Sequence, residues 1–140
     1  MTGEYEHSLD AKGRLFIPAR LREELGEEFY LTLSMSEDSC LYARSVADYE
    51  EYRSRVMQRS EGEQRLFRPY FVNAVRVTLD TQGRVLIPQK LRDWAGLSKN
   101  VTVLGVNNHA ELWDSDAWAK QSEMETSREN LAAIMRELGF

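Results

Sequence analysis

The chain has 140 residues and a formal charge of −5, because 23 acidic side chains outnumber 18 basic ones. Its 42% apolar and 29% charged residues are typical of a soluble globular domain, and the acidic balance argues against a binder coated in positive charge, such as a histone-like protein. A local basic patch stays compatible with that balance.

Several other classes are excluded by the same inventory. The single cysteine, Cys40, rules out an intramolecular disulfide and a cysteine metal cluster. We expect it to be a small buried residue, with a reactive thiol as the alternative. No apolar run approaches the roughly 20 residues that cross a bilayer, and the polar, acidic residues 1–10 are unlike a signal peptide. A cytoplasmic protein is therefore expected.

An internal repeat organises the chain. Residues 9–22 read LDAKGRLFIPARLR and residues 79–92 read LDTQGRVLIPQKLR, with eight of 14 positions identical at an offset of 70 residues. Unrelated segments would share about one position. Gly26 and Gly96 keep the same offset. We therefore predict a duplicated unit of about 50 residues.

The first copy predicts four strands and one helix in chain order. Alternation indicates a strand at 7–9, Asp-x-x-Gly-Arg is a turn, and an apolar run indicates a strand at 15–17. Pro18 suits the first turn of a helix through 20–25, which Gly26 ends. Strands at 29–35 and 41–42 follow. Helical spacing then predicts a helix at 46–60, and residues 64–71 are expected to form a second short helix or a turn that joins the halves.

The second copy repeats this order and is followed by two more helices. The expected elements are strands at 75–79, 85–87, 100–106 and 111–113, and helices at 90–95, 114–119 and 127–138. The last helix has an apolar stripe, which we expect to dock on the protein's own core or on a neighbour, a specific partner motif being the alternative: Leu131, Ile134, Met135 and Leu138.

Each copy is too small to bury a sufficient core alone, and its hairpins leave open edges. We therefore expect the two copies to complete each other's sheet around a pseudo-twofold axis, as one small shared β-barrel flanked by helices. The fold class is α+β with a mainly β core. The expected division is residues 1–60 as the first unit with its helix, 61–72 as a helical connector, and 73–140 as the second unit with the C-terminal helices.

The repeated LDxxGRxxIPxxLR resembles the signature of the AbrB/SpoVT swapped-hairpin superfamily. Two tandem copies, with GEYEHSLDAKGRLFIPARLR near the start and ELWD closing the second unit, resemble the MraZ family of bacterial regulators. The resemblance implies two tandem swapped-hairpin units. It also implies a sequence-specific DNA-binding protein that forms a ring-shaped homo-oligomer on promoter repeats upstream of the cell division and cell wall gene cluster. It places the protein at the nucleoid.

The turn motif has a structural and a functional interpretation. Asp10 and Arg14 are four residues apart across the first turn, as are Asp80 and Arg84 across the second. The carboxylate could cap backbone amides and pair with the guanidinium as a turn clamp. The turn could equally present arginine to phosphates or base edges, which its planar fork suits. The residues expected to build the turns are Asp10, Gly13, Asp80, Gly83 and Arg84.

The first copy is the more basic of the two at the motif. Residues 10–22 have a net charge of +3 and residues 80–92 of +2, and Lys12 has no cationic counterpart in the second copy. We therefore predict DNA contacts from Lys12 and Arg14 first, then from Arg20 and Arg22. For Arg22 and Arg92 the alternative is solvated pairing with glutamates such as Glu23 or Glu24. His7 could also reach DNA, although a plain strand-surface position is favoured.

A second basic run follows the first copy. It has five arginines against two glutamates and is typical of a solvated helix face or of inter-subunit ion pairs. Contact with the DNA backbone is the alternative. The run comprises Arg53, Arg55, Arg59, Arg65 and Arg68.

The sequence leaves two other functions as alternatives. One is an antitoxin-like or structural oligomeric module of the same superfamily. The other is an enzyme with an Asp10/Asp80 dyad, which the arginine four residues after each aspartate argues against, because it would hold the carboxylate ionised. We predict no enzyme, no catalytic residues, no metal and no cofactor. The expected partners are double-stranded DNA and further copies of the chain, with no membrane and no small-molecule substrate.

Overall fold

The two copies of the repeat exchange strands across one antiparallel sheet. The computed structural model describes residues 1–140, and the α+β class predicted from the sequence, with its mainly β core, is confirmed. The first half contains β1 (Glu4–Ser8), β2 (Arg14–Phe16), α1 (Ala19–Leu25), β3 (Glu28–Leu33), β4 (Leu41–Ser45), α2 (Val46–Met57), α3 (Glu61–Leu66) and α4 (Arg68–Val72). The second half contains β5 (Val75–Thr78), β6 (Arg84–Leu86), α5 (Gln89–Ala95), β7 (Asn100–Val106), β8 (His109–Asp114), α6 (Ser115–Glu125) and α7 (Arg128–Leu138).

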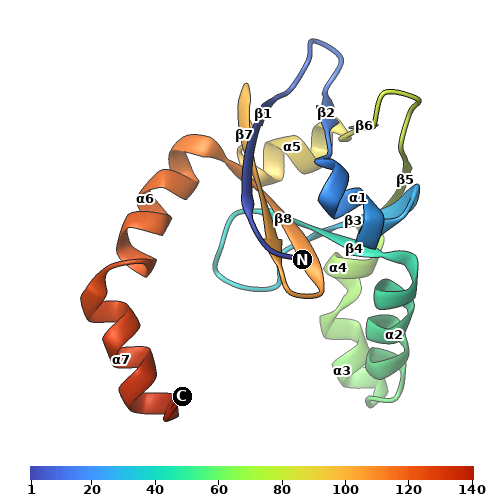
Figure 1. The fold of residues 1–140 in the computed structure, drawn as a ribbon. Coiled ribbons are helices and arrows are strands. Elements are labelled where there is room, and N and C mark those ends of the chain that lie inside the picture. Colours follow the sequence, from blue (N-terminus) through green and yellow to red (C-terminus); the bar gives the residue numbers. More distant parts are fainter.

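The strand order is symmetric between the copies. Six strands form one sheet in the order β1-β7-β8-β4-β3-β5, and β2 pairs with β6 in a separate two-stranded ribbon. The first strand of each copy pairs with the third strand of the other, β1 with β7 and β5 with β3. If each strand is replaced by its equivalent in the other copy, the same strand order results, read from the opposite edge of the sheet. The sheet is therefore complete only when both copies are present (Figure 1).

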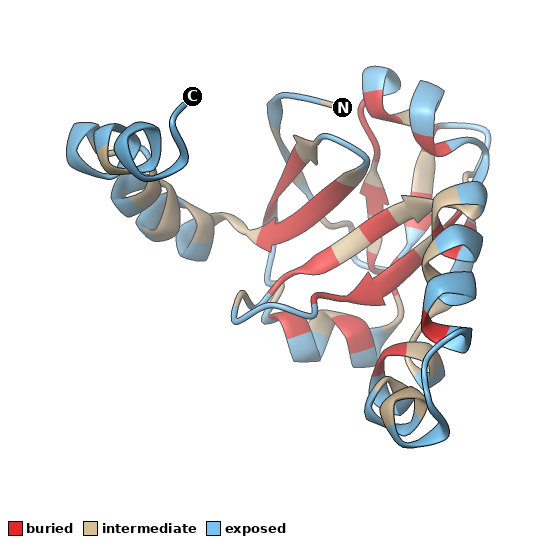
Figure 2. Cartoon of the chain, turned by 90° about the horizontal axis from the view of Figure 1, so that it is seen from below, coloured by how far each residue is buried: buried red, intermediate tan, exposed pale blue.

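Matched apolar residues of the two copies fill one core. Leu15 and Val85 are both buried, as are Ile17 and Ile87 at the ends of the ribbon strands. The helices α1 and α5 each bury two residues against this core, because their apolar positions recur at helical spacing. Figure 2 shows the buried residues concentrated in the strands and the exposed ones on the helices. The remaining core residues include Leu21, Leu91, Leu25, Ala95, Phe29, Leu31, Val101, Val103 and Leu112.

The observed element boundaries differ from the predicted ones at places where strand pairing or a proline sets the boundary. The first strand begins at Glu4 because β7 gives it hydrogen-bonding partners that local alternation does not reveal. The short helix or turn expected at 64–71 is two helices that meet at Phe67, and Pro69, which has no N–H, lies in the first turn of the second. Pro18 is the residue before α1 rather than inside its first turn.

Aromatic contacts hold α2 against the sheet and α4 against α2. Tyr49 of α2 stacks on Tyr30 of β3 with ring centroids 3.7 Å apart. The guanidinium of Arg44 lies 5.3 Å from the ring centroid of Tyr42 and 5.2 Å from that of Tyr52, and it donates to Asp48 at 2.7 Å. These helices therefore cover one end of the sheet, away from the β1–β2 and β5–β6 turns (Figure 1).

The C-terminal helices form an arm that leaves the sheet. Neither α6 nor α7 has a buried residue, and the predicted docking of the last helix on the protein's own core is absent within the single chain. No helix combines the length and the hydropathy that a membrane span requires. The apolar residues of the arm exposed to solvent are Met124, Leu131, Ile134, Met135, Leu138 and Phe140.

Candidate nucleic-acid interface

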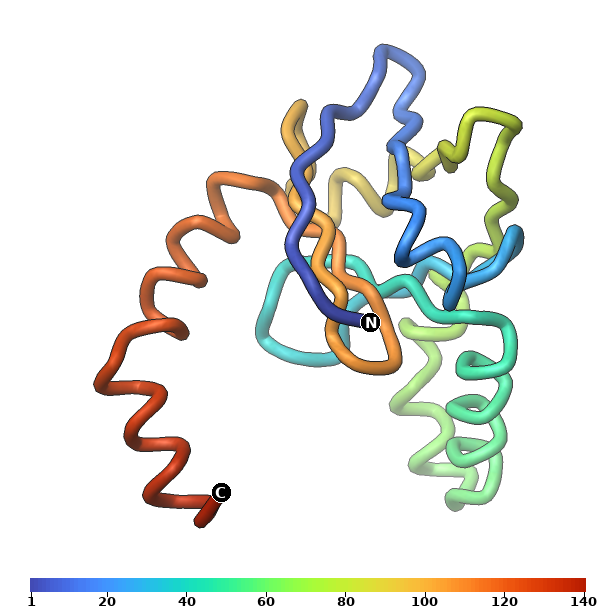
Figure 3. Tube along the Cα trace, in the orientation of Figure 1, coloured from blue at the N-terminus to red at the C-terminus, as the bar shows by residue number.

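The two Asp-x-x-Gly-Arg turns project from the same end of the molecule. They lie on either side of the β2–β6 ribbon, as the chain trace shows (Figures 1 and 3). The ribbon pairs Arg14 with Leu86 and Phe16 with Arg84. Beyond it, the amide of Ile17 donates to the carbonyl of Gly83 at 2.9 Å, and the symmetric bond joins Ile87 to Gly13 at 2.9 Å. Each turn is thus fastened to the strand of the other copy.

A carboxylate closes each turn. One oxygen of Asp10 accepts the backbone amides of Lys12 and Arg14, both at 2.9 Å, and the other accepts Nε of Arg14 at 2.6 Å. Asp80 accepts from Gln82 and Arg84 in the same way, with Nε of Arg84 at 3.0 Å. The two interpretations of the motif are therefore compatible: the aspartate closes the turn and pairs with the arginine, and the same arginine lies at the turn.

Hydrogen bonding shifts the acidity of the clamp. The backbone amide of Arg14 is the main cause that lowers the pKa of Asp10 to about 2, partial desolvation opposes it, and the Arg14 side chain and the Lys12 amide add to the lowering. The pKa of Asp80 is also lowered, chiefly by the Arg84 amide. Both carboxylates are consequently ionised throughout the neutral range.

The titration of Asp10 can be tested directly. We expect its carboxyl carbon, followed by NMR, to titrate with a midpoint near 2 instead of the ordinary 3.8. Because the folded pKa is depressed, the stabilisation by this group is fully present above the ordinary value and is lost as the pH falls through about 2. A midpoint near 3.8 in the folded protein would contradict the clamp.

The guanidinium groups keep free donors after clamping. Arg14 uses only Nε for Asp10, so Nη1 and Nη2 have no protein partner, and its side chain is 33% exposed. Arg84 is 27% exposed and also approaches Asp10, with Nη1 3.6 Å from the carboxylate oxygen. The Asp10 carboxylate therefore lies within reach of both arginines and holds them at the tip of the molecule.

Arginines from the helices support the turns from beneath. Gly13 and Gly83 are buried with φ of +85° and +77°. A side chain at Gly13 would meet the guanidinium of Arg92, and one at Gly83 would meet that of Arg22. Each supporting arginine comes from the other copy, so glycine is required at these positions for its backbone conformation and for the space.

The remaining predicted contacts lie in different environments. Lys12 belongs to the first turn, whereas Arg20 lies beside the N-terminal residues, and both are exposed and form no ion pair. Arg22 is half-buried, with its guanidinium 5.2 Å from the Phe16 ring centroid and its Nε unpartnered, and it forms no ion pair with a neighbouring glutamate. His7 packs on the same phenyl ring at 5.0 Å between centroids, which is the strand-surface position favoured for it.

The second basic run lies apart from the turns, on the helices. Arg53 pairs with Glu50 at 3.5 Å and Arg59 with Glu63 at 2.6 Å. Arg65 and Arg68 are exposed and unpaired. Within one chain the run is the solvated helix face that the sequence favours.

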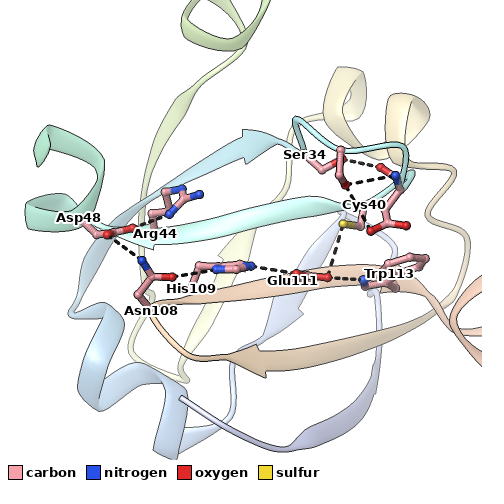
Figure 4. Close-up of polar contacts among 10 residues, drawn as sticks. Ser34, Cys40, Arg44, Asp48, Asn108, His109, Glu111 and Trp113 are labelled. Carbon is pink, nitrogen blue, oxygen red and sulfur yellow. Dashed lines mark hydrogen bonds and ion pairs between the residues drawn. The ribbon is translucent and has the colours of Figure 1, made fainter. Parts of the chain in front are cut away.

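Sequence reasoning missed a polar network on β8. The carboxylate of Glu111 is buried and lies 2.9 Å from Nε2 of His109, and it accepts the indole N–H of Trp113 at 2.9 Å. Nδ1 of His109 lies 3.1 Å from the side-chain oxygen of Asn108, whose amide donates to Asp48 (Figure 4). A glutamate among the apolar residues Ala110, Leu112 and Trp113 was the available signal.

Cys40 belongs to the edge of this network. Its sulfur lies 3.9 Å from the Glu111 carboxylate, and the residue is fully buried. Burial and the nearby carboxylate raise the pKa of the thiol well above its ordinary range. The prediction of a small buried residue is confirmed, and the reactive thiol is wrong.

The network makes Glu111 important for stability. Burial tends to raise the pKa of Glu111, but hydrogen bonds with His109 and Trp113 outweigh it and lower the pKa below its ordinary value. Replacing Glu111 with alanine leaves buried donors unpaired, and we expect a loss of about 3 kcal/mol in the free energy of unfolding. Urea denaturation measures this loss, with Glu123→Ala on the exposed face of α6 as the control. Equal stability of the two variants would contradict the role of the network.

Comparisons with known proteins match the whole chain. The family model described as "MraZ protein, putative antitoxin-like" matches twice, over residues 1–68 and 70–138. A protein named transcriptional regulator MraZ from Acetivibrio thermocellus is 44% identical over 99% of this chain and 98% of its own length. Proteins of the same name from Symbiobacterium thermophilum and Caldicellulosiruptor bescii are 41% and 39% identical, each over at least 99% of both chains.

The chain is a duplicated α+β unit with arginine-bearing turns at one end, and its relatives are named transcriptional regulators. These observations define it as a transcriptional regulator and not an enzyme. The chain belongs to the MraZ family, as the repeated motif indicated. The Asp10/Asp80 dyad alternative is thereby excluded, since the family is one of regulators.

Proposed function

We propose that the protein binds double-stranded DNA sequence-specifically through its basic turns, at promoter repeats of the cell division and cell wall gene cluster. The observation that supports this most strongly is the position of the two turns. Both lie at one end of the molecule, with the guanidinium groups of Arg14 and Arg84 held side-on by carboxylates and their outer nitrogens free or only loosely engaged. A guanidinium in this state can donate two parallel bonds to a phosphate or to a guanine edge.

The proposal assigns different tasks to the residues. Lys12 and Arg20 are exposed and unpaired, as phosphate contacts need to be. Arg14 reads bases, and Arg22 contacts DNA from the edge of the turn, where it also supports Gly83. The residues that build the turns are Asp10, Gly13, Asp80, Gly83 and Arg84.

We assign the two copies to tandem swapped-hairpin units that share a small barrel. Strand exchange between β1 and β7 and between β5 and β3 supports this assignment. Residues 1–60 and 73–140 are the two units, and residues 61–72 connect them.

Assembly into a ring completes the proposal. A few cations per subunit bind weakly, but a ring of identical turns would engage repeated sites on one duplex and gain affinity through effective concentration. The apolar arm of α7, which is exposed in the single chain, offers a surface for assembly. We place the protein in the cytoplasm, at the nucleoid.

An electrophoretic mobility shift with the promoter fragment tests the proposal. The wild-type chain should bind the repeat-bearing fragment at least 100-fold more tightly than a shuffled fragment of equal length, in the range of specific over non-specific binding. The difference should persist as salt weakens both complexes. Equal affinity for the two fragments would refute sequence-specific binding. A verified monomer that binds the repeats as tightly as the assembly would refute the role of the ring.

A further inference from the structure

The outer face of the β2–β6 ribbon carries one uncovered apolar side chain, Leu86. It is 55% exposed, although Leu15 and Val85 on the opposite face of the same ribbon are buried. Because strand residues alternate between faces, Leu86 shares the outer face with Arg84, and with Arg14 and Phe16 on β2. This face is the surface between the two turns.

The equivalent residue of the first copy is covered, and Leu86 is not. Phe16 stands 70 positions earlier and has the His7 ring at 5.0 Å and the Arg22 guanidinium at 5.2 Å from its ring centroid. Leu86 is the more exposed of the two, at 55%, whereas Phe16 is half-buried. The copies therefore differ at one point of the ribbon, where the second copy leaves an isobutyl group open to solvent.

The surroundings of Leu86 favour a nucleic-acid partner over a protein core. Leu86 is the cross-strand partner of Arg14, whose Nη1 and Nη2 are free. Arg84 lies two residues before it on the same face. An apolar side chain between two guanidinium groups fits an anionic ligand that has a single apolar group on its surface.

We propose that Leu86 contacts the 5-methyl group of a thymine in the major groove, next to the base pair that Arg14 contacts. The inference rests on the proposed DNA binding. A two-stranded ribbon fits the major groove, and the thymine methyl is the only apolar group among the base edges there. Cross-strand neighbours have Cβ atoms about 5 Å apart. Two side chains at that separation can reach neighbouring base pairs, which are about 3.4 Å apart.

Replacement of thymine by uracil removes only that methyl group and provides the test. The probe is a duplex with the site that the wild-type protein selects from a random library, made with thymine or with deoxyuridine. Dissociation constants of the full-length protein are measured by fluorescence anisotropy at one salt concentration. The wild-type protein should prefer the thymine duplex about fourfold for each contact, the factor expected from burial of one methyl group.

Two variants locate the effect. Leu86→Ala should bind both duplexes equally, with the affinity of the wild-type protein for the uracil duplex. Leu66→Ala, at a 73% exposed leucine on α3, should keep the wild-type preference. The inference is overturned if the wild-type protein is indifferent to uracil or if Leu86→Ala keeps the preference. It is also overturned if Leu86→Ala changes the oligomeric state, because the residue would then lie between subunits.

Failure of the inference is distinguishable from failure of the proposed function. If the wild-type protein selects a site but does not distinguish thymine from uracil, DNA binding stands and only the role of Leu86 is wrong. If the protein selects no site, both are wrong.

Discussion

Arg14→Ala is expected to abolish specific DNA binding and to leave folding and assembly intact. The side chain donates only Nε to Asp10, so its loss removes one partly exposed ion pair. Such pairs contribute at most about 1 kcal/mol. Loss of a two-pronged base contact costs about 1–3 kcal/mol for each subunit engaged. Several subunits on one duplex multiply that cost, so affinity for the repeats should fall at least 100-fold.

A matched control separates this effect from charge. Arg53→Ala also removes one positive charge, from a side chain on α2 that pairs only with Glu50. We expect it to bind the promoter fragment like the wild-type chain. Arg14→Lys keeps the charge but loses the planar fork, and should retain salt-sensitive binding while losing discrimination between the repeats and a shuffled fragment. Normal binding by Arg14→Ala would show that the site is assigned wrongly.

Gly13→Ala is expected to destabilise the fold by about 2–3 kcal/mol. The backbone at Gly13 has φ of +85°, a conformation that costs an L-residue about 1–2 kcal/mol. The added Cβ would also lie 2.7 Å from Cζ of Arg92. Arg92 can move away only by giving up its bond from Nε to the carbonyl of Ile87, at about 1 kcal/mol more. Thermal or urea unfolding measures the sum.

Alanine substitutions at two other glycines separate the backbone part of this destabilisation from the steric part. Gly96 has φ of +64° with open space around its Cβ position, so Gly96→Ala should lose only the backbone part of about 1–2 kcal/mol. Gly62 lies in α3 with no strain and no neighbour, so Gly62→Ala should be neutral or gain about 0.5 kcal/mol. In an Arg92→Ala background, Gly13→Ala should cost no more than Gly96→Ala. An unchanged cost in that background would show that Arg92 does not lie beneath the turn.

Local chemistry predicted the elements well because turns and helix ends are set by neighbouring residues. Asp10 and Gly13 specify the first turn by themselves, and Gly26 ends α1 with φ of +88°. The duplication was visible because it spans 14 aligned positions. The length of β1 was not, since residues 4–6 become a strand only through pairing with β7, about 100 positions later.

The support of the turns was beyond sequence reasoning for a different reason. Arg22 and Arg92 follow the helix start and read as solvated cations. Only the exchange of strands places each under the glycine of the opposite copy. The Glu111 network was missed for another reason. Its closest partners, His109 and Trp113, lie on the same strand, but only the packing of Cys40 and Asp48 around β8 makes the carboxylate part of a buried network.

Each turn is packed against an arginine of the other copy, and this affects how genetic screens on such a regulator are interpreted. Since the guanidinium of Arg92 lies against Gly13 of the first turn, substitutions in α5 should disturb the proposed DNA contacts of the first copy without any contact of their own. Loss-of-binding alleles are therefore expected in both halves of the gene, even if one half alone makes the proposed DNA contacts. Second-site suppressors of such alleles should map to the opposite half.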